Sequence, residues 1–288
     1  MPYSKKIPLY WYYDNLVSAN AVSRYLGRGT TNVQTASVFK KLTAIFASLI
    51  LAFSVVAILS GCSGNDDRST DEKFIEAVGK GLEARWAITD ADSASSSSTD
   101  TLKQALDKEK EAVKDFYDAD FDNEDLKSYA QKYIEALNGL NAEDYSSGSG
   151  FERWTRYYNQ RVAALYNINQ ISPISVSKSN ESNLTEILND GEEASAALAV
   201  MDKAEFTKQD PEYPEQTYFE YKAVVENDSN ISFSYFYYNI NLVDKDGVTV
   251  ETTTASTDDW AAGTKHAFEF TTDKQFETIE VTSCGWSL

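Results

Sequence analysis

Between residues 73 and 207, hydrophobic residues recur at steps of three and four positions, a period that predicts α-helices. Polar loops separate five such stretches, which cover residues 74–86, 102–117, 126–140, 151–168 and 184–200. Asp100 or Thr101 is expected to cap the second helix, and Asp122 or Asn123 the third. Gly191 is a candidate break in the fifth helix. Five helices in this span predict a helical bundle.

The hydrophobic period becomes two after residues 208–216, where Pro211 and Pro214 predict a linker. In the segment ISFSYFYYNINLV, Phe236, Tyr238, Ile240 and Leu242 share one strand face, and Tyr235, Tyr237, Asn239 and Asn241 share the other. Glycine turns separate further Thr-rich and aromatic strands. The fold class predicted is α+β in separate domains: a helical domain over 73–207, the linker, and a small antiparallel immunoglobulin-like β-sandwich over 217–288.

A second kind of hydrophobic pattern lies near the start of the chain. Lys40 and Lys41 precede eighteen uncharged residues, Leu42 to Leu59, which is the pattern of a secretory signal and also near the lower limit for a membrane-spanning helix. The residues that follow, Leu59-Ser60-Gly61-Cys62, resemble the lipobox of bacterial lipoproteins.

This resemblance implies cleavage between Gly61 and Cys62 and a covalent diacylglycerol on the sulfur of Cys62. Residues 40–61 would then be the signal peptide and residues 62–72 a lipidated tether. The alternative is an uncleaved transmembrane anchor, and both interpretations place residues 63–288 outside the membrane. Residues 1–39 form an N-terminal extension; we expect translation to start near Val38, and otherwise the extension is a cytoplasmic stub lost with the signal.

The C-terminal strands carry a further resemblance. Val225-Glu226-Asn227, then Ile240-Asn241-Leu242-Val243-Asp244, the turn glycines Gly247 and Gly263, and Phe268 follow the pattern of the FxLYD domain. This small immunoglobulin-like module belongs to extracytoplasmic lipoproteins of mostly Gram-positive bacteria. The chain departs from the pattern at Ile240 and Val243, where the family has aromatic residues, and at Ala262, where it has proline. The resemblance implies a fold and a surface location and brings no catalytic residues.

Charge narrows the classes of partner. The chain has 26 basic and 45 acidic residues, and residues 1–61 hold six of the former and only one of the latter. Because the rest of the chain is so acidic, it repels phosphate backbones, which argues against nucleic-acid binding. The same surface is expected to keep the protein soluble and to attract cations or basic partners.

Candidate chemistry is sparse. His266, the single histidine, shares a strand face with Phe268 and Phe270, so we expect it along the core edge rather than in a catalytic or metal site. The stretch Asp118–Tyr129 places acids at four positions of a calcium loop but lacks its glycine and closing glutamate, so a helix-capping turn is the preferred interpretation. Cys284 is expected to be a small buried hydrophobe.

Three aromatic residues at helical spacing, Trp154, Tyr157 and Tyr158, are expected in the core, with a sugar or peptide groove as the alternative. Tyr235 and Tyr237, opposite the core stripe, form a candidate exposed contact patch. No catalytic motif was found, and we predict no catalytic residue, no metal site and no cofactor apart from the lipid on Cys62.

The sequence thus predicts a lipoprotein anchored in the bilayer on the outer face of the cell membrane. Its predicted role is non-enzymatic, binding an unidentified protein or envelope ligand. One alternative is a cell-envelope hydrolase with a carboxylate pair in the helical domain. Another is a solute receptor, which ranks last because such receptors alternate strands and helices in two lobes.

Overall fold

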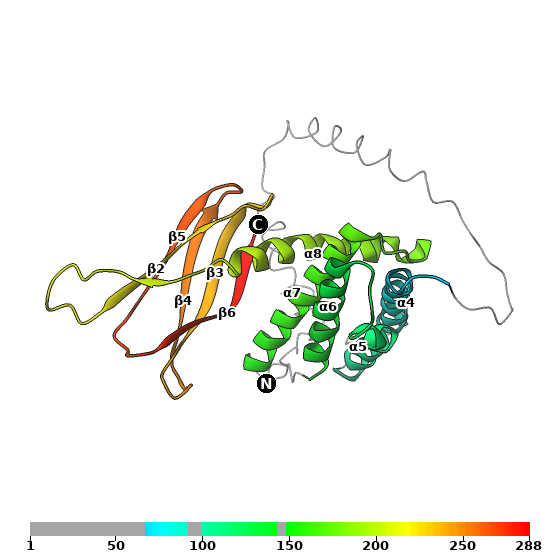
Figure 1. The fold of residues 1–288 in the computed structure, drawn as a ribbon, viewed down its shortest axis with the longest axis horizontal. Helices are drawn as coiled ribbons and strands as arrows, with labels where there is room; N and C mark the ends of the chain where they lie inside the picture. Colours follow the sequence, from blue (N-terminus) through cyan, green and yellow to red (C-terminus); the bar gives the residue numbers. More distant parts are fainter. Residues whose placement is uncertain (1–66, 92–98, 143–147) are drawn as a thin grey trace, which may run out of the picture.

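The computed structural model describes residues 67–91, 99–142 and 148–288, in which helices come first and strands follow (Figure 1). The helices are α4 (Thr70–Ala91), α5 (Thr99–Val113), α6 (Glu124–Ala142), α7 (Gly148–Ile171) and α8 (Glu181–Met201), with short 3-10 turns at Lys114–Phe116 and Lys178–Asn180. The strands are β1 (Thr207–Lys208), β2 (Phe219–Glu226), β3 (Phe233–Val243), β4 (Thr249–Trp260), β5 (Lys265–Thr272) and β6 (Thr278–Ser287). A helical region followed by a β-sandwich-like region is therefore confirmed.

Local hydrogen bonds account for two helix starts. Ser69 Oγ accepts from the Glu72 N–H at 3.1 Å while Glu72 Oε2 accepts from the Ser69 N–H at 3.1 Å, a reciprocal capping box at α4. Asn123 Oδ1 accepts from the Leu126 N–H at 2.9 Å, as predicted for α6. The predicted cap of the second helix is wrong. Because α5 begins at Thr99, Asp100 and Thr101 lie inside its first turn rather than before it.

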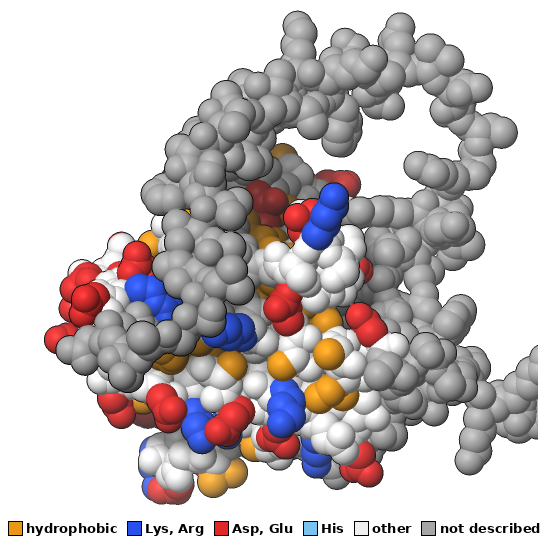
Figure 2. Space-filling view, turned by 90° about the vertical axis from the view of Figure 1, so that its right-hand side faces the viewer, with side chains coloured by type: hydrophobic (Ala, Val, Ile, Leu, Met, Phe, Trp, Pro, Cys, Tyr) orange, Lys and Arg blue, Asp and Glu red, His pale blue; other side chains and the backbone are white. Residues whose placement is uncertain are grey.

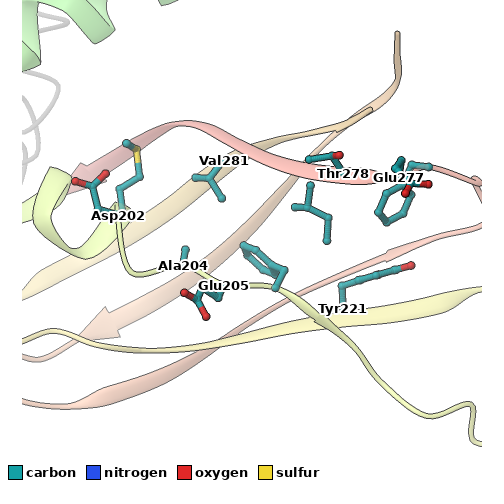
Figure 3. Close-up of a pocket in the computed structure, with 11 residues that line it drawn as sticks. Asp202, Ala204, Glu205, Tyr221, Glu277, Thr278 and Val281 are labelled. Carbon is teal, nitrogen blue, oxygen red and sulfur yellow. The ribbon is translucent and has the colours of Figure 1, made fainter. Parts of the chain in front are cut away.

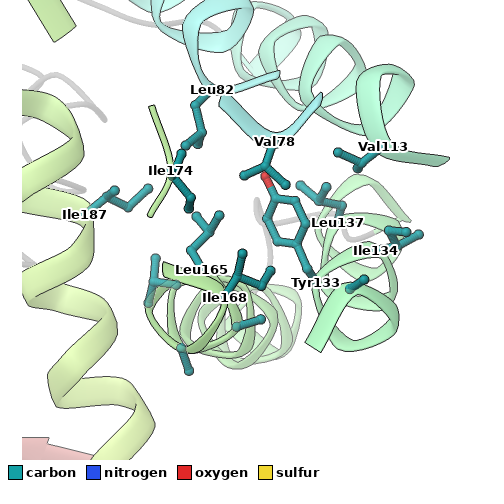
Figure 4. Close-up of a cluster of buried hydrophobic side chains, with 14 of the residues drawn as sticks. Val78, Leu82, Val113, Tyr133, Ile134, Leu137, Leu165, Ile168, Ile174 and Ile187 are labelled. Carbon is teal, nitrogen blue, oxygen red and sulfur yellow. The ribbon is translucent and has the colours of Figure 1, made fainter. Parts of the chain in front are cut away.

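The helical core gathers aliphatic and aromatic side chains from each of the helices α4 to α8 (Figure 4). The residues labelled there are Val78, Leu82, Val113, Tyr133, Ile134, Leu137, Leu165, Ile168, Ile174 and Ile187. The predicted break at Gly191 is absent, because α8 runs through it without interruption. A Cβ on Gly191 would lie 2.4 Å from the Val162 carbonyl oxygen, so this glycine serves the close approach of α7 and α8.

Two three-stranded antiparallel sheets pack face to face, in the orders β1-β2-β5 and β4-β3-β6. The predicted inward stripe of β3 is buried, and Tyr238 meets Phe268 of the opposite sheet at 4.6 Å between ring centroids. The turns after β3 and β4 contain Gly247 and Gly263 at φ of 79° and 74°, where glycine is favoured. The prediction of antiparallel strands after the linker is therefore confirmed, whereas β1 was not predicted.

The C-terminal end of α8 joins the two regions (Figure 1). Ala197 and Val200 are fully buried in the core of the sheets, and the Tyr238 hydroxyl donates to the Val200 carbonyl at 3.3 Å. Trp286 of β6 contacts both cores. Lys208, which the sequence analysis assigned to the linker, is the second residue of β1. The β-region therefore depends on packing from residues assigned to the helical domain.

The surface is polar and mixed in charge where Figure 2 shows it. Acidic, basic and apolar side chains are interspersed across this face. Such mixing is typical of a solvated surface. No described helix is long and apolar enough to cross a membrane, and the apolar run at 42–59 lies outside the described residues.

Candidate functional site

The sequence-predicted site residues fall into different places. Gly61 and Cys62 lie outside the described residues, so lipidation and cleavage remain predictions. Tyr235 and Tyr237 lie side by side on the outer face of β3, with ring centroids 5.7 Å apart. Tyr235 is 40% exposed, whereas Tyr237 packs over Gly285 and burial raises its pKa. Of this candidate patch, Tyr235 is therefore the accessible member.

The remaining singled-out residues have structural contacts. His266 Nε2 lies 2.7 Å from the Thr257 Oγ1, and the imidazole meets Phe268 edge to face at 5.6 Å, so it joins β5 to β4 along the core edge. In the acidic turn, the Asp71 carboxylate accepts from the backbone N–H groups of Asp122 and Asn123 at 2.9 and 3.1 Å. This turn thus tethers α4 to the start of α6, which fits the capping interpretation.

The predicted aromatic cluster belongs to the helical core. Trp154 is 5% exposed and stacks on Tyr158 at 5.4 Å between ring centroids. Tyr157 packs on Gly139 of α6. The three rings therefore hold α7 against its neighbours, as the preferred interpretation states.

A second polar centre lies inside the helices. The Glu109 carboxylate of α5 has no exposed surface and accepts from Arg161 Nε at 2.7 Å and from the Tyr133 hydroxyl, while Arg85 Nη1 lies 3.2 Å away. Desolvation alone would raise the pKa of Glu109, but the two guanidinium groups outweigh it and lower that pKa. Since four helices contribute to this network, it is a structural crosslink inside the bundle.

A hollow lies at the side of the sandwich (Figure 3). Its volume is about 710 Å³, and the end of α8, the α8–β1 connection, β2, the β5–β6 loop and β6 form its walls. We call it the groove; it is lined by Met201, Asp202, Ala204, Glu205, Phe206, Tyr221, Phe276, Glu277, Thr278, Ile279 and Val281.

The floor of the groove is aromatic. Phe206 inserts between the two sheets, with its ring centroid 5.3 Å from that of Phe270 and 6.2 Å from that of Tyr238. Tyr221 stacks on Phe270 at 5.1 Å and contacts Phe276 at 5.2 Å. These contacts fix the floor as a preformed apolar surface, the kind that binds ligands with little reorganisation.

Acidic groups lie around this floor. Asp202, Glu205 and Glu277 are all exposed, and none of the described residues that line the groove is a lysine or an arginine. In Figure 3, Asp202 and Glu277 lie towards opposite ends of it. Lys203, between two of the lining residues in sequence, forms an ion pair with Asp228. The groove therefore favours positively charged groups above an apolar surface.

A β-bulge in β6 sets where the groove ends. Ile279 and Val281 pair with inward residues of β3 and border the groove, and the register then shifts by one residue at Thr282. Because of this shift, Cys284 and Trp286 also face inward, where α8 covers them. The Cys284 thiol lies 3.7 Å from the Ala197 carbonyl, and burial raises its pKa to about 12. Cys284 is only partly buried, so the expectation of a small buried residue is met in part.

None of the groove residues was singled out by the sequence analysis. Two signals were available: Glu205-Phe206 and Phe276-Glu277 each place an acid beside an aromatic residue at a strand end. Their convergence follows from which strands lie at the sheet edges. Strand order is not encoded in hydrophobic period, so the local pattern could not reveal the groove.

Comparisons with known proteins add little. No protein-family model matches the chain, and no curated protein matches it. Among solved structures, the chain is similar to IrmA from Escherichia coli with a TM-score of 0.25 and 16% sequence identity, over 29% of this chain and 75% of that chain.

Proposed function

We propose that this protein is a membrane-anchored extracytoplasmic lipoprotein, held in the bilayer by a diacylglycerol on Cys62, and that it binds a partner through the groove. The proposed role is recognition rather than catalysis. Residues 1–39 and 40–61 would be absent from the finished protein, and the FxLYD-like likeness of residues 217–288 agrees with a location outside the cell membrane.

Residues 40–62 support the anchor. A basic pair, an uncharged run of eighteen residues and the sequence Leu-Ser-Gly-Cys occur in the order that lipid modification requires. Each buried CH₂ of an acyl chain contributes about 0.8 kcal/mol, so two chains hold a protein stably at a bilayer. The polar residues that follow Cys62 would separate the folded region from the lipid.

The groove is the single observation that carries the binding role. It combines an aromatic floor fixed by ring contacts with exposed carboxylates at its rim. Recognition surfaces commonly have this arrangement, in which a buried apolar centre supplies affinity and a polar rim supplies orientation.

Metabolic labelling tests the anchor. Cells producing the full chain receive an alkyne analogue of palmitate, and the purified protein is examined for label and by mass spectrometry. We expect label on the natural chain and none on Cys62→Ala, which retains the signal residues. Label on both chains, or an unlabelled natural chain still joined to residues 1–61, would contradict lipidation at this cysteine.

Site-specific photo-crosslinking tests the groove. Glu205 is replaced by p-benzoylphenylalanine in the full chain, and Asp120, exposed in the turn before α6, is replaced in a matched control. Illumination of intact cells is expected to give a discrete adduct from position 205 and none from position 120. An absence of adducts at position 205, or equal adducts at both positions, would count against a partner in the groove.

A further inference from the structure

The strand beside the groove is an open sheet edge. In the part of the chain that the structure describes, β6 pairs with β3 alone, and no described backbone hydrogen bond joins its other edge to a further segment. That edge borders the groove through Thr278, Ile279 and Val281. An unpaired edge presents N–H and C=O groups in a row and is a template for another extended chain.

The edge also lacks two of the residues that natural proteins use to block such pairing. β6 contains neither proline nor lysine. The open part is short, because the bulge at Thr282 and the covering end of α8 close it from Cys284 onward. Residues 278–281 span about 13 Å at 3.3 Å per residue, which is room for a paired segment of about four to six residues.

Side-chain chemistry selects the sequence of that segment. Alternate side chains of an extended peptide point to opposite sides, so one set would lie on Phe206 and Tyr221 in the groove. The other set would lie on the outward side, beside the exposed Glu280 of β6, and the carboxylates of Asp202, Glu205 and Glu277 surround the segment at the rim of the groove. A segment alternating apolar and basic residues matches both.

We propose that the groove binds an extended peptide segment of a partner protein, alternating apolar residues with lysine or arginine, which adds as a strand to the free edge of β6. This inference rests on the proposed function, since it names the ligand class of the same groove. Strand addition uses the backbone for affinity and alternate side chains for specificity.

Fluorescence anisotropy tests the ligand class. The full chain in detergent micelles is titrated into fluorescein-labelled Lys-Val-Lys-Val-Lys-Val, with Glu-Val-Glu-Val-Glu-Val as the matched control. We expect saturable binding of the lysine peptide that weakens as salt increases, and at least tenfold weaker binding of the glutamate peptide. No binding of the lysine peptide, or equal binding of both peptides, would overturn the proposal.

Backbone methylation separates strand addition from charge attraction alone. Methylating alternate peptide nitrogens on the edge that would pair with β6 keeps every side chain and removes the donors. We expect methylation on this edge to weaken binding at least tenfold, and the peptide methylated on the opposite edge to bind like the parent. Equal binding of all three peptides would refute pairing with β6.

Variants of the protein test whether the peptide binds in the groove. Glu205→Lys with Glu277→Lys, both exposed positions, is expected to weaken binding at least tenfold, and Ala204→Trp is expected to fill the groove and do the same. Asp118→Lys with Asp120→Lys, both exposed in the turn before α6, is the charge-matched control and is expected to bind like the natural chain; near-UV circular dichroism confirms that each variant is folded. Undiminished binding by the folded groove variants would overturn the proposal.

The other occupants are distinguishable. If light scattering showed that the chain dimerises and that the groove variants are monomers, a second copy would be the occupant and the peptide proposal would be wrong. A crosslinked adduct at position 205 in cells together with no peptide binding would keep the proposed function and reject only this ligand class. Failure of the crosslinking as well would reject both.

Discussion

Glu109 shows how a single buried residue can hold several helices together. Its carboxylate faces Arg85 of α4, Tyr133 of α6 and Arg161 of α7. Arg161 is fully buried, and among the described residues neither of its Nη atoms has a hydrogen-bond acceptor in good geometry, although Nη2 lies 2.6 Å from Glu109 Oε1. The cost of burying these guanidinium groups is therefore offset mainly by one carboxylate.

Substitution Glu109→Gln is expected to destabilise the protein by about 3–5 kcal/mol, because it leaves two arginines without a counter-charge in a buried site. Urea unfolding followed by circular dichroism measures the change. Glu111→Gln on the same helix is the control: this side chain is exposed, and because solvent screens its pair with Lys114, we expect a much smaller loss of stability. Equal losses in the two variants would contradict a central role for the buried carboxylate.

The pKa of Asp190 shifts in the opposite direction to that of Glu109. Desolvation, with Glu193 and Glu186 nearby, raises its pKa from 3.8 to about 6, so the folded state binds this proton more tightly than the unfolded state. Its contribution to stability is therefore full below about pH 4 and is lost as pH rises towards 6. We expect Asp190→Asn to be more stable at pH 7, by about 1 kcal/mol after allowance for solvent screening.

Unfolding midpoints measured between pH 4 and pH 7 test this sign. The natural chain should lose stability over that range relative to Asp190→Asn, whereas Glu215→Gln, an exposed change in the segment between β1 and β2, should follow the natural chain. A difference between Asp190→Asn and the natural chain that stays constant with pH would contradict titration of this carboxyl in the folded state.

Among the elements, α8 differs most from its prediction in its middle, where the helix continues through Gly191. Glycine in a helical pattern has low propensity, which favoured a break at Gly191. The structure instead uses the missing side chain to bring the α8 and α7 backbones together. Whether a glycine ends a helix or lies in a helix–helix contact depends on a neighbour far away in sequence, and the local pattern does not contain it.

Replacing Gly191 tests whether helix propensity or the contact between α7 and α8 has the larger effect on stability. Gly191→Ala gains about 1 kcal/mol of helix propensity but places a methyl group against the Val162 carbonyl, so we expect a net loss of about 1–3 kcal/mol in urea unfolding. Gly81→Ala in α4 is the comparison, since its nearest contact would be 3.1 Å rather than 2.4 Å. A stabilised Gly191→Ala variant would show that α7 and α8 can move apart freely.

The strands were predictable because alternating exposure leaves a period of two in the sequence, as in β3. The bulge at Thr282 could not be predicted from the sequence, because a change of register is defined only against the partner strand. The groove combines this bulge, a sheet edge and the end of α8, so its residues could not be assembled from sequence alone.

At the scale of the whole molecule, the sequence predicts two separate domains, whereas the structure shows residues of the helical region packed in the core of the sheets. The composition changes at the two prolines after β1, and a boundary there follows from the sequence. The packing does not end at that boundary, because the last turns of α8 and Phe206 complete the core of the sheets. Since these residues also form a wall of the groove, the helical region positions the candidate binding site.

Val200→Ala tests whether the helices and sheets unfold together. Val200 is fully buried against the sheets, and we expect the truncation to cost about 2 kcal/mol and to lower the unfolding midpoint equally by two probes. Circular dichroism at 222 nm reports the helices, and hydrogen exchange of β3 peptides, pulse-labelled at each urea concentration and measured by mass spectrometry, reports the sheets. Val224→Ala is the matched control, because this valine is 62% exposed on β2. If Val200→Ala shifted the β3 transition and left the helical one unchanged, the two regions would be independent, as the sequence alone suggested.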